Sequence, residues 1–471
     1  MFAPVVAALA AGAFQSVPTV PFGALTTPDL TVACISDPIN ARRWGCPVGR
    51  GMHYVHHVAL SPDGRNLYSA AGALPNPPDD HGTIGIFRRD AAGGGLRQLS
   101  GRNGCVTHPG IPQGSEGCAI GRSVHAMRFV TVSGDGRFVY GTGVQGISIF
   151  RRSKKRGTLS QLPGRKGCIN QEGSDGCAQA QAMRMTEDLT FTADGRFAYT
   201  ASSDSSAVAS FRRYPRTGAL RPLPGRKACI RQQGDSMAYT PGCATGRGLE
   251  KARSVTLSPD ERFLYVASID DSLAIFRRNR RTGDLRQLSG PDGCLDISGR
   301  GGCARVRGLY GPHRITFAPS GRFAYLAGKR GAGRGSTVVV FAHDTASGAL
   351  HQLPGGEGCI TTDGLDGCSL GRHVKGAHAA LPDAEGRTLY LSADGDGGGL
   401  AVFRIDRRTG RLTQLPGPLG CLSDSNFPED GCAVAAAVGG IHFAVLSPDG
   451  RFLYGAGEDA RSVAVLSRRD H

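Results

Sequence analysis

The stretch from Ser254 to Cys303, SVTLSPDERFLYVASIDDSLAIFRRNRRTGDLRQLSGPDGCLDISGRGGC, contains every part of a unit that recurs along the chain. It has a short apolar run, a Pro-Asp turn, a second apolar run, a third run ending in Phe-Arg-Arg, a Thr-Gly turn, a fourth run and a loop with two cysteines. Short apolar runs separated by turn residues are typical of β-strands. The unit therefore predicts one four-stranded antiparallel sheet and its exit loop.

Seven copies of this unit follow one another, and each has an arginine just after its first turn. These turn arginines are spaced 72, 59, 66, 60, 65 and 64 residues apart and are Arg65, Arg137, Arg196, Arg262, Arg322, Arg387 and Arg451. A fixed internal period must be interpreted before domains are counted by length. Because no unrelated block interrupts the series, we expect one closed architecture to use nearly all of the 471 residues.

The copies at the two ends are incomplete and complement each other. Gly23-Ala24-Leu25 precedes Cys34 without the first three strands of a copy, and the last copy stops after its third strand, SVAVLSRRD. We expect the strand near Leu25 to pair with the strand around Ser462 to Leu466, which would hide the backbone edges of the last sheet. The sequence predicts an all-β, seven-bladed β-propeller over residues 23–471 after a leader at residues 1–22.

Fourteen cysteines form one pair in each copy. The pairs are Cys34 with Cys46, Cys105 with Cys118, Cys168 with Cys177, Cys229 with Cys243, Cys294 with Cys303, Cys359 with Cys368 and Cys421 with Cys432. Their gaps of 9 to 14 residues are wider than the knuckles of zinc sites, so they predict disulfides. Disulfides persist in oxidising compartments, which predicts a secreted or extracytoplasmic protein.

The first residues, MFAPVVAALAAGAFQS, resemble part of a signal peptide. They have an apolar core and an Ala-Gly-Ala triplet but no basic residue before the core. A disordered leader is the alternative. No run of the chain approaches the roughly 18 apolar residues that a membrane span needs.

The net charge of +16 comes largely from arginine pairs that recur in the copies. They end the third strands, and we expect them to form a solvated basic rim that could hold an anionic envelope polymer: Arg88-Arg89, Arg151-Arg152, Arg212-Arg213 and Arg277-Arg278. No stacking aromatics interleave with them, which argues against nucleic acid as a partner.

The sequence motifs of the repeat resemble those of the lactonase-type seven-bladed propeller family, which includes phosphogluconolactonase-like enzymes. These motifs are Ser-Pro-Asp-Gly-Arg-Phe-Leu-Tyr, then Val-Ala-Val-Phe-Arg-Arg and Thr-Gly-x-Leu. The segment from Gly311 to Lys329, GPHRITFAPSGRFAYLAGK, is similar to that family's Pro/His-containing start of an inner strand. There the family commonly has an active-site glutamate after the second strand, where this chain has the segment Gly328-Lys329-Arg330. A second family element, a His-rich strand start followed by an acid after the next strand, is echoed in part by His125.

One polar residue in each copy stands about seven residues before the turn acid, at the start of the inner strand. These residues are His56, Arg128, Glu187, Arg253, His313, His378 and His442, of which His378 is displaced by an insertion after Leu381. Since inner strands of a propeller converge, we expect them to ring one mouth of the central channel, beside the cysteine loops.

We expect this ring to carry positive potential and to bind a small anionic or lactone ligand. Arg128 or Arg253 would polarise a lactone carbonyl, while a neutral histidine or Glu187 activates water. The predicted catalytic residues are His56, Arg128, Glu187, Arg253 and His313, and the predicted ligand-binding residues are His57, Asp188, Arg314, His378 and His442. The alternative is that these side chains only solvate the channel.

No cofactor and no metal is expected. Asp270-Asp271 and Asp394-Gly-Asp396 offer only part of a calcium ligand set, and Gly328 to Gly335 lacks the ending of a phosphate loop. We expect a monomer. The two functions left open are an exported lactonase-like protein that binds and hydrolyses its ligand, and a non-catalytic extracellular or cell-envelope scaffold for a protein or an anionic polymer.

Overall fold

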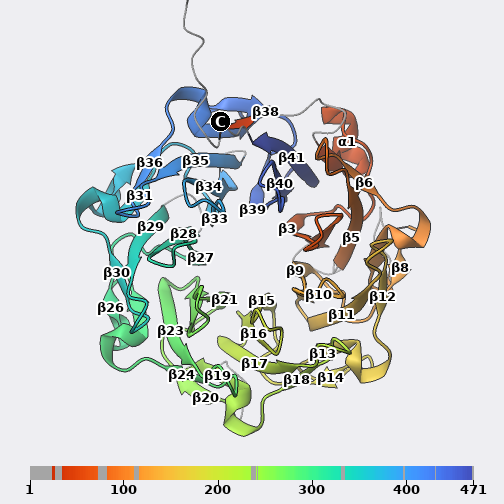
Figure 1. Ribbon diagram of the computed structural model, residues 1–471, viewed down its shortest axis with the longest axis horizontal. Helices are drawn as coiled ribbons and strands as arrows, with labels where there is room; N and C mark the ends of the chain where they lie inside the picture. Colours follow the sequence, from red (N-terminus) through yellow and green to blue (C-terminus); the bar gives the residue numbers. More distant parts are fainter. Residues whose placement is uncertain are drawn as a thin grey trace, which may run out of the picture.

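The computed structural model describes residues 24–26, 34–72, 82–110, 116–234, 240, 242–329, 335–395, 398–429 and 431–468. These residues form seven sheets, which Figure 1 shows arranged radially around a central axis. The predicted seven-bladed propeller is therefore confirmed. The predicted leader at residues 1–22 and Asp396 lie outside the described residues. Within those residues, no helix has the length and apolar character needed to cross a membrane.

Three long strands run outward in each blade, numbered here from blade 1 to blade 7. The inner strands are β3 (Val55–Leu60), β9 (Met127–Val132), β15 (Thr186–Phe191), β21 (Ala252–Leu257), β27 (Pro312–Phe317), β33 (Ala377–Pro382) and β39 (Ile441–Leu446). The second strands are β4 (Asn66–Gly72), β10 (Phe138–Gly143), β16 (Phe197–Ser202), β22 (Phe263–Ser268), β28 (Phe323–Lys329), β34 (Thr388–Ala393) and β40 (Phe452–Gly457). The third strands are β5 (Gly82–Arg89), β11 (Gly146–Arg152), β17 (Ala207–Arg213), β23 (Ser272–Arg278), β29 (Ser336–His343), β35 (Gly399–Ile405) and β41 (Ser462–Arg468).

The outer strand differs from the single strand that we expected, because a 3-10 turn splits it. In blade 1, β6 (Leu96–Gln98) pairs with the end of β5 and β7 (Cys105–Thr107) pairs with its beginning, with η1 (Gly101–Asn103) between them. The first halves in the next blades are β12 (Leu159–Gln161), β18 (Leu220–Pro222), β24 (Leu285–Gln287), β30 (Leu350–Gln352) and β36 (Leu412–Gln414). The second halves are β13 (Cys168–Asn170), β19 (Cys229–Gln232), β25 (Cys294–Asp296), β31 (Cys359–Thr361) and β37 (Cys421–Asp424).

A short parallel strand follows each second half, and a disulfide joins the two. Cys105 begins β7 and Cys118 immediately precedes β8 (Ala119–Ile120), which runs parallel to β7. The later parallel strands are β14 (Ala178–Gln179), β20 (Ala244–Gly246), β26 (Ala304–Arg305), β32 (Ser369–Leu370) and β38 (Ala433–Ala435). Cys243 and Cys368 likewise stand directly before β20 and β32. Each bridge therefore fixes a short strand to the edge of its own blade.

The structure confirms all seven predicted cysteine pairs, and every bridge joins two residues of the same copy. The bonded pairs are Cys34 with Cys46, Cys105 with Cys118, Cys168 with Cys177, Cys229 with Cys243, Cys294 with Cys303, Cys359 with Cys368 and Cys421 with Cys432. The first pair differs in one respect from the expected loop, because helix α1 (Pro38–Trp44) lies between Cys34 and Cys46.

Both ends of the chain build the last blade, as predicted. β1 (Leu25–Thr26) and β2 (Cys34–Ser36) both pair with β41, so that Leu25 lies opposite Arg468 and Ile35 lies opposite Val463. In Figure 1 the first strands lie beside the last ones at the top of the ring. Helix α1 follows β2 and is capped by the side chain of Asp37.

Apolar residues cover both faces of each second strand because a blade packs between two neighbours. Leu264 and Val266 pack with blade 3, whereas Phe263 and Tyr265 pack with blade 5. The hydrophobic core is therefore a series of layers between blades. This closes the ring and holds the inner strands at fixed positions around the axis.

A buried polar contact also ties most neighbouring blades together, and we call it the inter-blade latch. In its complete form, the last arginine of the third strand contacts a tyrosine on the second strand of the preceding blade and the acid in that blade's first turn. Arg152 Nε donates to Tyr68 Oη (2.9 Å) and Arg152 Nη2 lies 2.9 Å from Asp63 Oδ1. Arg89 and Arg213 make equivalent latches.

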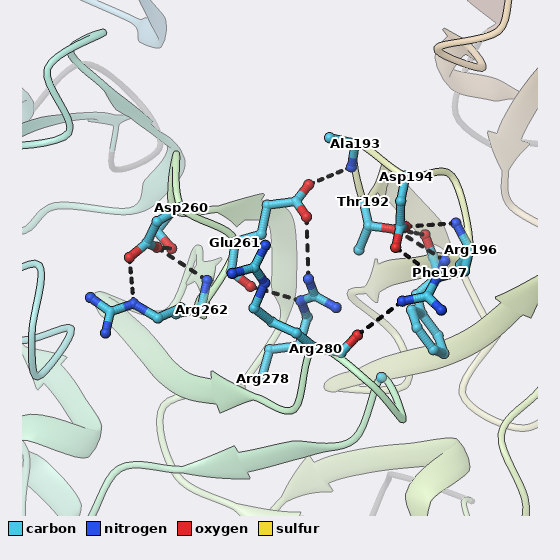
Figure 2. Close-up of polar contacts among 12 residues, drawn as sticks. Thr192, Ala193, Asp194, Arg196, Phe197, Asp260, Glu261, Arg262, Arg278 and Arg280 are labelled. Carbon is cyan, nitrogen blue, oxygen red and sulfur yellow. Dashed lines mark hydrogen bonds and ion pairs between the residues drawn. The ribbon is translucent and has the colours of Figure 1, made fainter.

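The latch between blades 3 and 4 has a different acid. Figure 2 shows Glu261, which stands where other turns have glycine, between the backbone of Ala193 in blade 3 and Arg278 of its own blade. Arg278 Nη2 lies 3.3 Å from Glu261 Oε2. The contact is kept although the residue that supplies the carboxylate has changed.

The latches correct the predicted basic rim. The second arginine of each Phe-Arg-Arg ending is buried, and only the first arginine is exposed: Arg89, Arg152, Arg213 and Arg278 are buried, and Arg88, Arg151, Arg212 and Arg277 are exposed. Half of the predicted rim is therefore structural, because these guanidiniums find tyrosine and carboxylate partners on the neighbouring blade.

Candidate functional site

The seven polar residues of the predicted ring all lie at β-bulges in their inner strands. In blade 1, Val55 pairs with Ala71 and His57 pairs with Ala70, so His56 has no partner on β4. The same register shift leaves out the equivalent residue of each other blade: Arg128, Glu187, Arg253, His313, His378 and His442. A bulge re-aims a side chain away from the sheet. Here it lets one side chain per blade project toward the axis.

These seven side chains line one narrow cavity of about 60 Å³. It is also lined by the next residues along the inner strands: His57, Phe129, Ser254, Arg314, Ala379 and Phe443. A water molecule occupies about 30 Å³ of liquid. The cavity therefore holds water or the reacting group of a ligand, and a larger ligand would have to extend into the open mouth.

Blades 6 and 7 place an imidazole between two carboxylates. His442 Nε2 contacts Glu458 Oε2 and lies 3.2 Å from Asp394 Oδ2. Burial alone would lower the pKa of His442, but the two carboxylates outweigh it and raise that pKa. Burial likewise opposes ionisation of both acids, yet hydrogen bonds from the neighbouring histidines hold the pKa of Asp394 and of Glu458 well below their usual range. The two carboxylates therefore flank an imidazole whose protonated form they favour.

The other histidines of the ring are neutral. Burial, together with the charged His442 nearby, lowers the pKa of His378 to about 3. Burial and Arg128 lower the pKa of His56, and burial, His378 and Arg253 lower that of His313. A neutral imidazole can accept a proton, and the raised pKa of His442 favours its proton-donating form.

Arginines complete the ring on blades 2 and 4. Arg128 Nη1 lies 2.7 Å from His56 Nε2, and Arg253 Nη1 lies 3.0 Å from Glu187 Oε1. Arg253 is the more accessible of the two, with its side chain 24% exposed. No hydrogen bond of His313, on the next blade, is found among the described residues, although its ring packs against that of His378. Arg253 and His313 thus place a partly exposed cation and a neutral imidazole on neighbouring blades.

Of the predicted residues His57, Asp188 and Arg314, His57 and Arg314 line the cavity, and Asp188 binds Arg314. Arg314 Nη2 donates to Asp188 Oδ2 (2.8 Å) across the channel. The ring of His57 packs between Phe129 and Phe443, with both centroid distances at 3.9 Å. These contacts hold the side chains of His57 and Arg314 in place at the cavity wall. The ring of His125, which echoed a family element, instead packs against the ring of His108 at a tilt.

Sequence reasoning did not assign to the ring three charged groups that act on it. Lys329, Asp394 and Glu458 stand at the same point of blades 5, 6 and 7, seven residues after the turn arginine. This constant offset is a signal that the sequence does contain. With Asp394 and Glu458, the ring region carries four carboxylates, the other two being Glu187 and Asp188. Their negative charges largely balance the positive potential that we predicted for the ring.

Two sets of donor atoms here have the composition of a metal site: His56, His442 and Glu458, and His378, Asp394 and His442. In each set the ligand atoms lie within 4.8 Å of one another. However, the Lys329 ammonium already contacts Asp394, and the Arg128 guanidinium already contacts His56. A metal ion would add positive charge next to both, so the arrangement is better suited to proton transfer and to hydrogen bonding of a ligand.

The neutral state of His378 predicts a loss of stability in mild acid. Its pKa is about 3 when folded, below the ordinary value of 6.5, so the unfolded chain binds more protons between these values. Stability therefore falls as pH decreases below 6.5, by about 2 kcal/mol at pH 5 from this residue alone. His442 affects stability in the opposite pH range. Its stabilising contribution is complete below pH 6.5 and is lost as the pH rises through its raised pKa.

Urea unfolding at pH 7 and pH 5 checks this expectation, with His378→Asn as the comparison. The variant should lose less stability between these two pH values than the wild type does. An equal loss in both proteins would show that His378 is not the group responsible.

No protein-family model and no curated protein matches this sequence. Solved structures do resemble it. A periplasmic gluconolactonase from Pseudomonas aeruginosa aligns over 76% of this chain and 83% of its own, with 18% identity and a TM-score of 0.51. Hydrazine synthase from Kuenenia stuttgartiensis aligns over 90% of this chain and 98% of its own, with 14% identity and a TM-score of 0.51. At these identities the likeness concerns the fold alone, the β-propeller described above.

Proposed function

We propose that this chain is an exported lactonase-like propeller that binds a small lactone at the cysteine-loop mouth and hydrolyses it. The observation that carries this proposal is that Arg253 and the neutral His313, on neighbouring blades, line the same cavity on the axis. The seven disulfides support export, because such bridges persist in oxidising compartments. The lactonase-like fold supports the reaction class only by analogy.

The proposed reaction adds water across the ring ester. His313 accepts a proton from water while the water oxygen attacks the carbonyl carbon. Arg253 donates hydrogen bonds to the oxyanion that forms. The ring C–O bond then breaks, and the proton returns from His313 to the departing oxygen to give a hydroxy acid. The small cavity would admit the carbonyl and the water, while the rest of the lactone lies in the mouth.

The charged cluster around His442 would orient the site. His442 is held by Glu458 and Asp394, and Asp394 also accepts from His378 Nε2 (2.9 Å). His378 packs in turn against His313, with ring centroids 4.3 Å apart. This chain of contacts would fix the orientation of the proposed base, so we assign His378 and His442 a positioning role.

Release of acid from five- and six-membered lactones, neutral and phosphorylated, tests the proposal on the oxidised protein. We expect turnover that falls about 100-fold or more in His313→Ala and about 100-fold in Arg253→Ala. Arg277→Ala, on an exposed arginine at the other end of the blade, should leave turnover unchanged. No turnover on any lactone, or turnover that survives both ring substitutions, would contradict the proposal.

A specific observation also favours the second candidate, a non-catalytic extracellular scaffold. Equivalent positions on the cysteine loops carry exposed apolar residues on four consecutive blades, 5, 6, 7 and 1, and polar residues on the other three. The apolar residues are Leu370, Val434, Val48 and Ile120, and the polar ones are Gln179, Thr245 and Arg305. Such an arc suits a protein partner better than a polymer. Absence of turnover, with partner binding that Leu370→Ser abolishes, would favour this function.

A further inference from the structure

The interface between blades 5 and 6 lacks the inter-blade latch. The third strand of blade 6 ends in Ile405, where five of the other blades have arginine and blade 5 has histidine, and the first turn of blade 5 has Ser320 where others have an acid. Tyr325 keeps only its hydrogen bond to the carbonyl of Gly410 (3.2 Å). Elsewhere the latch is kept or partly replaced, as by His343, whose Nε2 lies 2.9 Å from Tyr265 Oη.

A cavity of about 730 Å³ opens where the latch is missing. Ala318, Phe323 and Ile405 form its apolar floor, and Ser320 and Gly386 line it from the turns of the two blades. At the interface of blades 1 and 2, Arg152 occupies the corresponding space: it contacts the turn carbonyl of Gly136 and the acid Asp63, and its side chain is completely buried. Ile405 is shorter and has no partner to reach, so this space stays open.

Arginines surround the cavity without matching acids. Arg322, Arg407 and Arg408 line it and are exposed, and none of them forms an ion pair with any residue that the structure describes. The one carboxylate in the lining, Glu385, is already held by Arg468 (3.2 Å). The cavity therefore combines an apolar floor with an uncompensated positive rim.

We propose that this cavity binds an amphipathic carboxylate, an alkyl or aryl chain that carries one carboxylate group. The chain would lie against Phe323 and Ile405, and the carboxylate would accept hydrogen bonds from Arg322 and Arg407. Arginine matches a carboxylate in geometry as well as in charge. The volume falls in the range of about 300 to 1,000 Å³ that small-molecule sites occupy. The site lies at the far end of the inner strands from the channel mouth, so it is independent of the proposed hydrolysis.

Calorimetric titration of the oxidised full chain with octanoate tests this site. We expect binding that weakens about 10-fold in Arg322→Ala and again in Arg407→Ala, the loss typical of one charged hydrogen bond. Octanol and acetate, which lack the charge and the chain respectively, should each bind at least about 10-fold more weakly than octanoate. Arg277→Ala, at a latched interface, and Arg128→Ala, in the channel, should bind octanoate as the wild type does.

The sharpest variant rebuilds the missing latch. Ser320→Asp combined with Ile405→Arg should fill the cavity, abolish octanoate binding and raise the melting temperature. If that double variant does not fold, Ile405→Trp fills the same space without a charge and should also abolish binding. Octanoate affinity that is unchanged in Arg322→Ala and in the filled variant, or equal affinity for octanol, would overturn the proposal.

Discussion

Replacing Cys168 and Cys177 together by alanine is expected to lower the free energy of unfolding by about 3 kcal/mol. The bridge joins residues nine apart in sequence and ties β14 to β13 at the edge of blade 2. Its main effect is to restrict the unfolded chain, because the loop that it closes would otherwise have many more conformations. Urea unfolding of the oxidised variant and the oxidised wild type measures the difference.

The same logic predicts that full reduction unfolds the protein. Seven such bridges contribute on the order of 20 kcal/mol on this scale, more than the roughly 5–15 kcal/mol by which folded domains are typically stable. Under reducing conditions the wild type and the double alanine variant should therefore become indistinguishable, which serves as the control. A reduced protein that keeps the melting temperature of the oxidised one would contradict this account.

Replacing Arg152 by methionine is expected to lower the free energy of unfolding by about 3 kcal/mol. This value is the lower end of the range expected when one partner of a buried ion pair is removed. The Arg152 side chain is fully buried and bonds Tyr68, Asn66 and Asp63 of the preceding blade. Methionine keeps much of the volume but leaves the buried Tyr68 hydroxyl and the Asn66 amide without their donor. Asp63 is partly exposed, so water compensates part of its loss.

Arg151 provides the matched control, since it is the adjacent residue and is exposed. Arg151→Met should change the free energy of unfolding by less than about 0.5 kcal/mol, as is usual for surface positions. Urea unfolding of both variants separates the two arginines of the pair. Equal effects would show that the latch adds nothing beyond a surface charge.

The latch also explains why the proposed cavity at Ile405 is open. At most blade interfaces a polar side chain occupies the space between a second-strand tyrosine and the next blade's third strand. In blade 2 the side chain of Arg152 fills this space, and in blade 5 that of His343 fills it. In blade 6 Ile405 leaves the space open. A repeat architecture can lose one such contact because the remaining interfaces still hold the ring closed.

The repeat period, the strand order and the disulfide pairs could all be predicted from residue patterns. Each depends on residues close together in one copy, such as the Ser-Pro-Asp turn, the Phe-Arg-Arg ending and the two cysteines of a loop. Ring closure followed from two incomplete copies, and the structure bears it out in the pairing of Cys34 with Ala464. The helix between Cys34 and Cys46 was not expected, because no other copy has an equivalent segment from which to infer it.

Local periodicity therefore encodes the propeller and the position of one polar side chain on each inner strand, since both can be counted from the turns. Contacts between blades decided the charge state of His442, the burial of Arg152 and the open space at Ile405. The physical reason is that burial and ionisation depend on neighbours from other blades. Asp63 is 89 residues from Arg152 in sequence, and Glu458 reaches His56 only once the ring has closed.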